Sequence, residues 1–367
     1  MGLSKLGLYI EQSEARNDAG LLGEESVVGL STQKEIIQTK ADLSGVSLYS
    51  YKLFPPMSFA YVPDTSRRGN KIALAFNMTE TTYLVSSIYT VFRVVEIKKL
   101  DPWYLFIYFN RPEFDRYSRF NSWGSARETF NWEDMCDIDF DLPVLPMQHK
   151  FSNIYKAMVA NQRSYEHGLG DLKLVCDGYI EELRRKTPCE EIGNFIGQSK
   201  ETNIDGAISL EQGINIEKKF IAPQRSNENF WGRKIVRTGQ IAYCTQLNNE
   251  NVAVALRTGP DCIVSEVYDV IYIRDQSKLL PEYLMMWLTR REFGRYVYWA
   301  SQGTSYEFLS YENLAGYKIP VPDIGVQQTI VSIYNTYIRR REINERLKAQ
   351  IKDICPILIK GSLVEGA

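Results

Sequence analysis

The sequence predicts a mixed α/β (α+β) fold: two similar domains separated by a pair of long antiparallel coiled-coil-like helices, with a pseudo-two-fold internal repeat. Three observations predict it. Fourteen residues recur in order at a constant offset of 179 positions, as from Val85 to Val264. In each copy, short β-branched and aromatic segments are followed by a proline that opens a helix. Each copy then ends in a long segment whose seam residues step by 4 and 3.

The duplication is the most informative of these features. The residues that recur 179 positions later are Val85, Ser86, Tyr89, Pro102, Tyr104, Leu105, Phe114, Arg116, Tyr117, Gly124, Pro143, Gln148, Ile154 and Tyr155. A repeat this regular indicates two copies of one structural unit. Two similar units can bind two similar partners, or two parts of one extended partner.

Composition places the chain among folded proteins. It has 367 residues, of which 44% are hydrophobic and 24% charged, enough for two domains. No apolar run of membrane-spanning length and no signal peptide is found, so we expect a cytoplasmic protein. Six scattered cysteines predict reduced thiols, and the only histidines, His149 and His167, lie near no cysteine pair, so no metal site is expected. The net charge of −2 neither indicates nor excludes nucleic-acid binding.

The first part of each copy reads as strand, helix, loop and extended segment. Residues 85–95 and 262–273 are expected as strands. Helices are expected from Pro102 to about Arg119 and from Pro281 to about Tyr298. Small polar loops then contain Gly124 and Gly303, and proline-punctuated extended segments follow.

The second part of each copy is predicted as a long helix, at about 148–186 and 327–355. The seam residues are Ile154, Met158, Asn161, Tyr165, Gly168, Leu172, Val175 and Tyr179, and Ile333, Tyr337, Arg340, Asn344, Leu347, Ile351, Ile354 and Leu358. We expect the two helices to pair antiparallel, as a rod of ~45 Å for ~30 residues; the alternative is that each packs only on its own domain. Polar Asn161, Arg340 and Asn344 would set the register. Three glycines weaken the first helix, and Pro356 should end or kink the second.

The repeat continues upstream with small gaps. Residues 6–13 match 192–199, residues 29–37 resemble 213–221 with Lys34 opposite Lys218, and 58–61 resemble 240–243. The predicted domains are 1–146 and 188–325, with spacer helices at 147–187 and 326–367, the last including a C-terminal tail. A shared frame with divergent loops indicates one scaffold that carries two different recognition surfaces.

No catalytic constellation is found in the sequence. Dinucleotide, P-loop, GxSxG and HExxH motifs are absent, and both histidines read as surface or capping residues. No catalytic residue and no metal ligand is therefore assigned.

Loop residues of the kinds that bind DNA are present in both copies. The polar, basic loop 64–71 is expected to have its counterpart in 225–234, and the glycine loops 122–127 and 301–306 are matched. Arg and Lys donate to phosphates and guanine, and Asn or Gln pairs with adenine; the alternative for each is a solvated loop residue. The candidates are Lys34, Arg67, Arg68, Lys71, Ser125, Arg127, Lys218, Arg225, Asn227, Arg233, Lys234, Tyr243, Gln302 and Thr304.

Taken together, this order of features resembles the specificity (S) subunit of type I restriction-modification systems. Each copy has a strand, Pro-x-Tyr-Leu, a helix ending near Phe-x-Arg-Tyr, a glycine loop, and a proline-punctuated segment followed by glutamine, as in Lys318-Ile319-Pro320-Val321-Pro322 before Gln327. The resemblance covers essentially the whole chain. It rests on order, duplication and length, because no single motif is specific.

The resemblance implies a division of labour. Each domain would be a target recognition domain that reads one half of a split double-stranded DNA target. The helices would set the spacer and dock two modification (methyltransferase) subunits, and restriction subunits would complete the nuclease. S-adenosylmethionine, ATP and magnesium are expected on those partners, and no cofactor on this chain. The alternatives are a stand-alone DNA-modifying enzyme and a paired-module protein scaffold that does not bind DNA.

Overall fold

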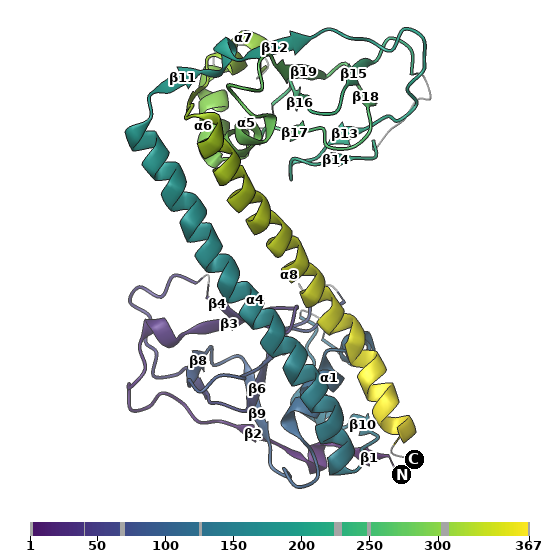
Figure 1. Cartoon of the computed structure of the whole chain (residues 1–367). Coiled ribbons are helices and arrows are strands. Elements are labelled where there is room, and N and C mark those ends of the chain that lie inside the picture. The colour runs from purple at the N-terminus through teal and green to yellow at the C-terminus, as the bar shows by residue number, and fades with distance from the viewer. Residues whose placement is uncertain are drawn as a thin grey trace. The chain divides into compact units, whose positions relative to one another are not determined.

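The computed structural model describes residues 3–39, 41–66, 70–124, 127–223, 230–247, 251–301 and 308–365. The chain divides into two compact units. Unit 1 comprises Met1–Tyr165 and Ile343–Ala367, and unit 2 comprises Glu166–Glu342. The division falls inside the two long helices, so each unit contains one globular part and one half of each helix (Figure 1).

Unit 1 is built on a four-stranded antiparallel sheet in the order β2-β9-β6-β7, in which each strand pairs with its neighbour. Strands β2, β9 and β6 are labelled in Figure 1. Its elements are β1 (Ser4–Lys5), η1 (Leu6–Leu8), β2 (Ile10–Ser13), η2 (Glu24–Ser26), β3 (Val28–Leu30), β4 (Ile36–Gln38), β5 (Lys52–Phe54), β6 (Ser58–Tyr61), β7 (Leu74–Phe76), β8 (Tyr83–Val85), β9 (Thr90–Val94), α1 (Pro102–Phe109), α2 (Pro112–Phe120), α3 (Trp132–Cys136) and β10 (Asp139–Phe140). Three two-stranded sheets, β1-β10, β3-β4 and β5-β8, complete it.

Unit 2 repeats this architecture with no counterpart of η2 among its described residues. It contains β11 (Cys189–Glu191), η3 (Ile192–Asn194), β12 (Ile196–Ser199), β13 (Gly213–Ile214), β14 (Phe220–Ile221), β15 (Lys234–Val236), β16 (Ile241–Cys244), β17 (Val254–Leu256), β18 (Cys262–Val264), β19 (Tyr268–Ile273), α5 (Pro281–Leu288), α6 (Arg291–Ala300), α7 (Tyr311–Ala315) and β20 (Lys318–Pro320). The sheet order β12-β19-β16-β17 and the pairs β11-β20, β13-β14 and β15-β18 match those of unit 1. The predicted mixed α/β fold and its internal repeat are confirmed.

Two element predictions need correction. The expected strand 85–95 is two strands, because Tyr89 N donates to Ser86 O at 3.0 Å and turns the chain between β8 and β9. The equivalent bond in unit 2, from Tyr268 N to Ser265 O, separates β18 from β19. The expected helix after Pro102 is also broken, because Pro112 begins a new helix.

The sheet and the helices meet in an aromatic core. In unit 1 the ring of Phe59 stacks on Phe76 at 4.6 Å and on Phe92 at 5.0 Å, and meets Phe109 of α1 edge-on. Asp101 caps α1 by accepting from Trp103 N at 3.0 Å, with Pro102 at the first helical position. The core fixes α1 and α2 on one face of the sheet.

A buried glutamine ties the start of each long helix to the loop before α1 or α5. Gln148 Nε2 donates to Lys99 O and Pro143 O, both at 2.7 Å, and its Oε1 accepts from Asp101 N at 2.9 Å. Gln327 makes the equivalent bonds, to Lys278 O (2.7 Å), Pro322 O (2.9 Å) and Leu280 N (3.0 Å). Both side chains are fully buried. This glutamine clamp explains why the pair recurs in the repeat.

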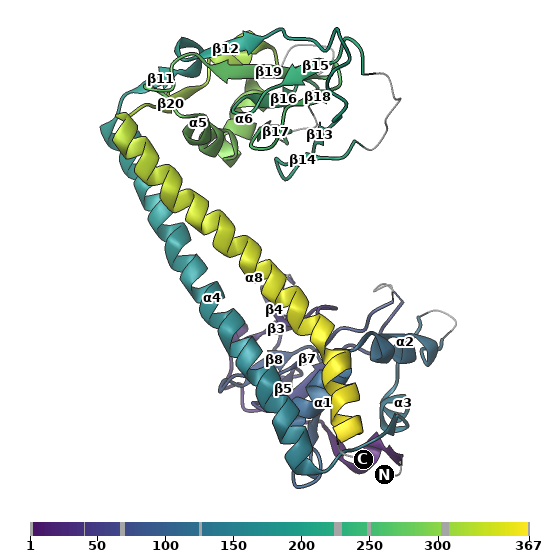
Figure 2. The ribbon, with the colours of Figure 1, turned by 45° about the vertical axis from the view of Figure 1, so that its right-hand side comes forward.

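The two long helices are α4 (Leu145–Lys186) and α8 (Ile324–Glu365), and they pair antiparallel within each unit. In unit 1 an ion pair joins Lys150 to Glu365, and Gln162 Nε2 donates to Asn344 Oδ1 at 3.0 Å. Figure 2 shows α1 beside the end of α8, where the Tyr104 and Ser362 hydroxyls lie 2.7 Å apart. Pro356 lies inside α8 and does not end it, so of the two predicted effects only a kink stays a prediction.

The seam of α4 differs from the predicted frame at alternate positions. Five of the buried residues are spaced by seven: Tyr155, Gln162, Leu169, Cys176 and Leu183. Of the predicted residues one position earlier, Ile154 (42% exposed), Asn161 and Val175 are exposed. The predicted frame of α8 holds better, since Asn344, Ile351 and Leu358 are buried. The polar pair in the seam is therefore Gln162 with Asn344, and Asn161 takes no part.

Candidate nucleic-acid interface

The structure brings two of the candidate loops together in each unit. In unit 1, Thr65 N donates to Glu128 O at 3.0 Å, and Phe130 N donates to Pro63 O at 2.9 Å. In unit 2, Leu309 N donates to Thr245 O at 2.8 Å. The loop after β6 or β16 is thus joined to the segment after α2 or α6, in the same way in both units.

The glycine of the first loop is required by a tight turn. Gly124 has φ +146°, and a Cβ there would lie 2.0 Å from Arg127 O. Trp123 and Thr129 exchange backbone hydrogen bonds of 3.1 and 3.0 Å across the turn. Of the two readings of this glycine, close approach to a partner and a tight turn, the structure supports the turn.

Of the candidates in these joined loops, the structure describes Lys71 and Arg127, and both are exposed. The candidates that lie outside the described residues are Arg67, Arg68, Ser125, Arg225, Asn227, Gln302 and Thr304.

The expected counterpart of loop 64–71 is wrong. That loop connects β6 to β7, whereas 225–234 lies between β14 and β15. The segment that connects β16 to β17, residues 245–253, occupies the equivalent place. The two loops have similar composition, and composition alone does not show that they connect different pairs of strands.

Lys34 and Lys218 are engaged inside their own units. Both have positive φ, 66° and 63°, in the hairpin turns that follow β3 and β13. Lys34 Nζ lies 2.5 Å from Asp115 Oδ1 and 2.8 Å from Ile72 O, and burial lowers the pKa of this lysine. Lys218 Nζ donates to Leu288 O at 2.7 Å. In this conformation neither ammonium faces outward to meet a phosphate.

Because these two lysines have different partners, Lys218 is expected to make the stability of the chain depend on pH. The position equivalent to Asp115 is Gly294, so the half-buried Lys218 has no carboxylate partner there, and desolvation lowers its pKa to about 8. The folded chain then binds fewer protons than the unfolded chain between pH 8 and 10.5, so this group makes stability rise with pH there.

We expect Lys218→Met to be more stable than the parent at pH 7, by up to about 3 kcal/mol, and to lose that advantage near pH 10. Urea unfolding at both pH values tests this, with the exposed neighbour Lys219→Met as control. An equal response from the two variants would contradict it.

Lys234 and Tyr243 also have internal partners, which centre on Asp269. Lys234 Nζ lies 2.5 Å from Asp269 Oδ1, and the fully buried Tyr243 hydroxyl donates to Asp269 Oδ2 at 3.4 Å. Burial, reinforced by this carboxylate, raises the pKa of Tyr243. Arg233 pairs with the largely buried carboxylate of Glu211 at 3.6 Å. These contacts give the three residues structural roles in unit 2.

Sequence reasoning missed a group of exposed aromatic side chains. Phe120 (75% exposed) ends α2, Trp123 (65%) follows it, and Trp299 (68%) lies near the end of α6. Phe120 and Trp299 are related by the offset of 179 but differ in type, so a comparison of identical residues passes over them.

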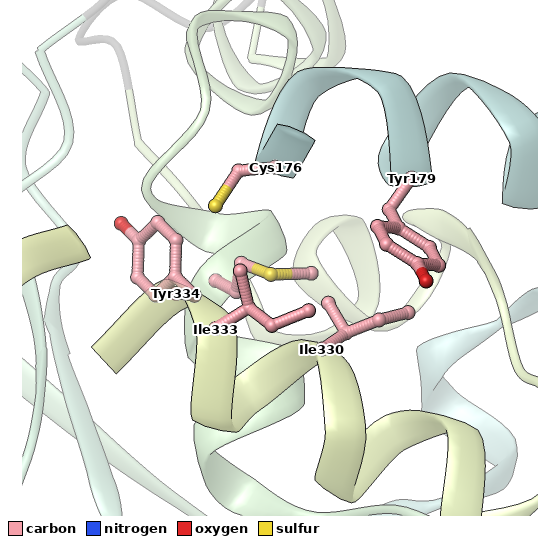
Figure 3. A pocket seen from close by; sticks show the side chains of 6 residues that line it. Cys176, Tyr179, Ile330, Ile333 and Tyr334 are labelled. Atoms are coloured by element: carbon pink, nitrogen blue, oxygen red, sulfur yellow. The ribbon is translucent and has the colours of Figure 1, made fainter. Parts of the chain in front are cut away.

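A small apolar hollow, too narrow to hold a water molecule, lies between α4, α5 and α8 in unit 2 (Figure 3). It is lined by Cys176, Tyr179, Met286, Ile330, Ile333 and Tyr334. Burial raises the pKa of the Cys176 thiol, so the reactive thiolate is disfavoured. The hollow is a packing gap beside the helix pair and offers no catalytic group.

Three further observations concern metal ligands, membrane spans and the two histidines. Among the described residues, no three or more His, Cys, Asp and Glu side chains are grouped to hold a metal ion. No helix in the described part of the chain is long and apolar enough to cross a membrane. His149 and His167 are both exposed on α4, as predicted.

The described residues form repeated α/β units with paired long helices, and comparison with known proteins shows which family this chain resembles. Residues 242–353 match the family model described as the type I restriction modification DNA specificity domain. The predicted resemblance to the specificity subunits of type I systems is thereby confirmed. No match was found among curated proteins.

A solved structure shares the fold over nearly the whole chain. The type I restriction-modification S subunit from M. genitalium superposes with a TM-score of 0.60 at 9% identity, covering 98% of this chain and 95% of that one. The HsdS subunit from Thermoanaerobacter tengcongensis has a TM-score of 0.40 at 14% identity, covering 98% and 96%. The superposition on the M. genitalium S subunit is the one that supports a shared fold.

Proposed function

We propose that this chain is the sequence-specific DNA-recognition subunit of a type I restriction-modification complex. Unit 1 and unit 2 would each read one half of a bipartite target in double-stranded DNA. The observation that carries the proposal is the repeat in structure: the same elements occur in the same sheet order twice, while the loops differ. Two equivalent scaffolds with different loops suit a target whose two halves differ in sequence.

The helices α4 and α8 would set the spacing between the half-sites and dock two modification subunits. Each helix contributes to both units, so its length couples one reader to the other. In this proposal the chain works in the cytoplasm and is not catalytic. S-adenosylmethionine belongs to the modification subunits, and ATP and magnesium to restriction subunits where these are present. The lack of catalytic motifs in the sequence supports this division.

A pair of assays separates the proposal from its alternatives. The chain with its modification subunits should bind duplex DNA with an affinity that falls steeply as salt rises. The isolated chain, given labelled S-adenosylmethionine, should transfer no methyl group above a no-protein control. Robust transfer by the isolated chain would favour a stand-alone DNA-modifying enzyme. No salt-dependent affinity even with the partners present would favour a protein scaffold.

A further inference from the structure

The outer faces of α2 and α6 each carry an exposed arginine with an exposed aromatic side chain four residues later. Arg116 and Phe120 lie four residues apart on α2, and Arg295 and Trp299 lie four apart on α6, so each pair shares one helix face. The opposite faces hold Phe114 and Phe293, which are buried in the cores. The fold of each unit thus uses the inner face of the helix, while the arginine and the aromatic ring face solvent.

Each ring contacts another aromatic ring of its own unit. Phe120 lies at the end of α2, where Ser122 Oγ donates to Ser118 O at 2.6 Å, and the centroids of the Phe120 and Trp123 rings lie 6.5 Å apart. In unit 2 the centroids of the Trp299 and Tyr296 rings lie 6.1 Å apart, and the Tyr296 hydroxyl donates to Asn313 O at 2.9 Å. These contacts limit the positions open to the rings, so less conformational entropy is lost when they contact a partner.

The charge around the pair suits a polyanion. Arg116 is 70% exposed and pairs only with Glu113, at 3.2 Å on the surface, a contact that costs little to exchange. The segment after α2 adds the exposed cation Arg127, and the loop after β6 that is joined to it adds Lys71. An arginine beside an exposed ring can bind a phosphate while the ring packs on the adjoining sugar.

We propose that these two pairs, Arg116 with Phe120 and Arg295 with Trp299, grip the sugar–phosphate backbone of DNA without reading its sequence. The inference rests on the proposed function. The two halves of a split target differ in their bases but have the same sugar–phosphate backbone. A contact that is present in both units therefore suits the backbone better than the bases. The loops that differ between the units then supply the base contacts.

The test uses the full chain assembled with its modification subunits. Phe120→Ala combined with Trp299→Ala should weaken binding about a hundredfold on target and on unrelated duplex alike, about tenfold for each of the two aromatic contacts removed. The ratio of the two affinities should stay unchanged. Arg116→Gln combined with Arg295→Gln should reduce the slope of log affinity against log salt by about 2, one phosphate for each arginine. Tyr49→Ala, at a ring 60% exposed elsewhere in unit 1, and Arg93→Gln serve as matched controls.

Each other result overturns the inference in its own way. Unchanged affinity and salt slope would remove the pairs from the interface. A loss confined to the target duplex would make them base readers. Loss of assembly with the modification subunits at unchanged DNA affinity would assign the surface to that protein partner. If the unaltered complex shows no salt-dependent DNA binding, the proposed function fails as well, which separates that failure from the others.

Discussion

Replacing Gln148 by leucine is expected to destabilise unit 1 by about 3–6 kcal/mol. The side-chain amide satisfies Asp101 N, Lys99 O and Pro143 O at 2.7–2.9 Å in a site closed to water. Leucine fills the volume but leaves three backbone groups without partners, and each buried unsatisfied group costs about 1–3 kcal/mol. The loss also frees the start of α4 from the loop that precedes α1.

Hydrogen exchange read peptide by peptide locates this effect. Gln148→Leu should lower protection across the unit 1 sheet, and Gln327→Leu should do the same in unit 2, because the second clamp makes the equivalent three bonds. Gln328→Leu is the matched control, since Gln328 is exposed one residue along the same helix. A loss of protection no greater than in the control would show that the clamp contributes nothing to stability.

Lengthening both long helices by seven residues is expected to lengthen the preferred spacer of the DNA target. The insertions belong between Tyr165 and Glu166 in α4 and between Glu342 and Ile343 in α8, where the chain passes from one unit to the other. Seven residues add about 10 Å of helix and keep the seam on one face. At 3.4 Å per base pair this corresponds to an increase of up to about three base pairs.

Selection from a duplex library with randomised spacer length measures this change. The same seven residues appended after Ala367 give a control of equal composition that should keep the original spacer. Retained tight binding with an unchanged spacer in the doubly lengthened chain would mean that α4 and α8 do not set the distance between half-sites.

The repeat made most of the fold predictable. Prolines at the starts of α1 and α5, and the Gln148 and Gln327 positions, mark equivalent points of the two units. Local breaks were harder to predict. Hydrophobic pattern does not show the turn at Ser86–Tyr89, since the residues on both sides have strand character. The predicted seam of α4 used the positions equivalent to the seam of α8, and at alternate positions it lies one residue before the buried residue. Packing within unit 1 turns Tyr155 inward instead of Ile154.

The site was less predictable, for a physical reason. Lysine is usually a surface residue, yet Lys34 reaches Asp115, 81 positions away, and Lys234 reaches Asp269. A single sequence does not show which carboxylate the fold will bring near a lysine. The exposed Phe120 and Trp299 escaped notice because apolar residues in a helix are ordinarily assigned to the core.

Mapping of methylated adenines across the host genome, with and without the gene for this chain, tests the central claim most directly. The proposed function predicts a methylated motif of two different specific parts, separated by a fixed number of unspecified bases, that disappears when the gene is deleted. An unchanged pattern of methylation, or loss of a single contiguous motif, would contradict two-part recognition by units 1 and 2.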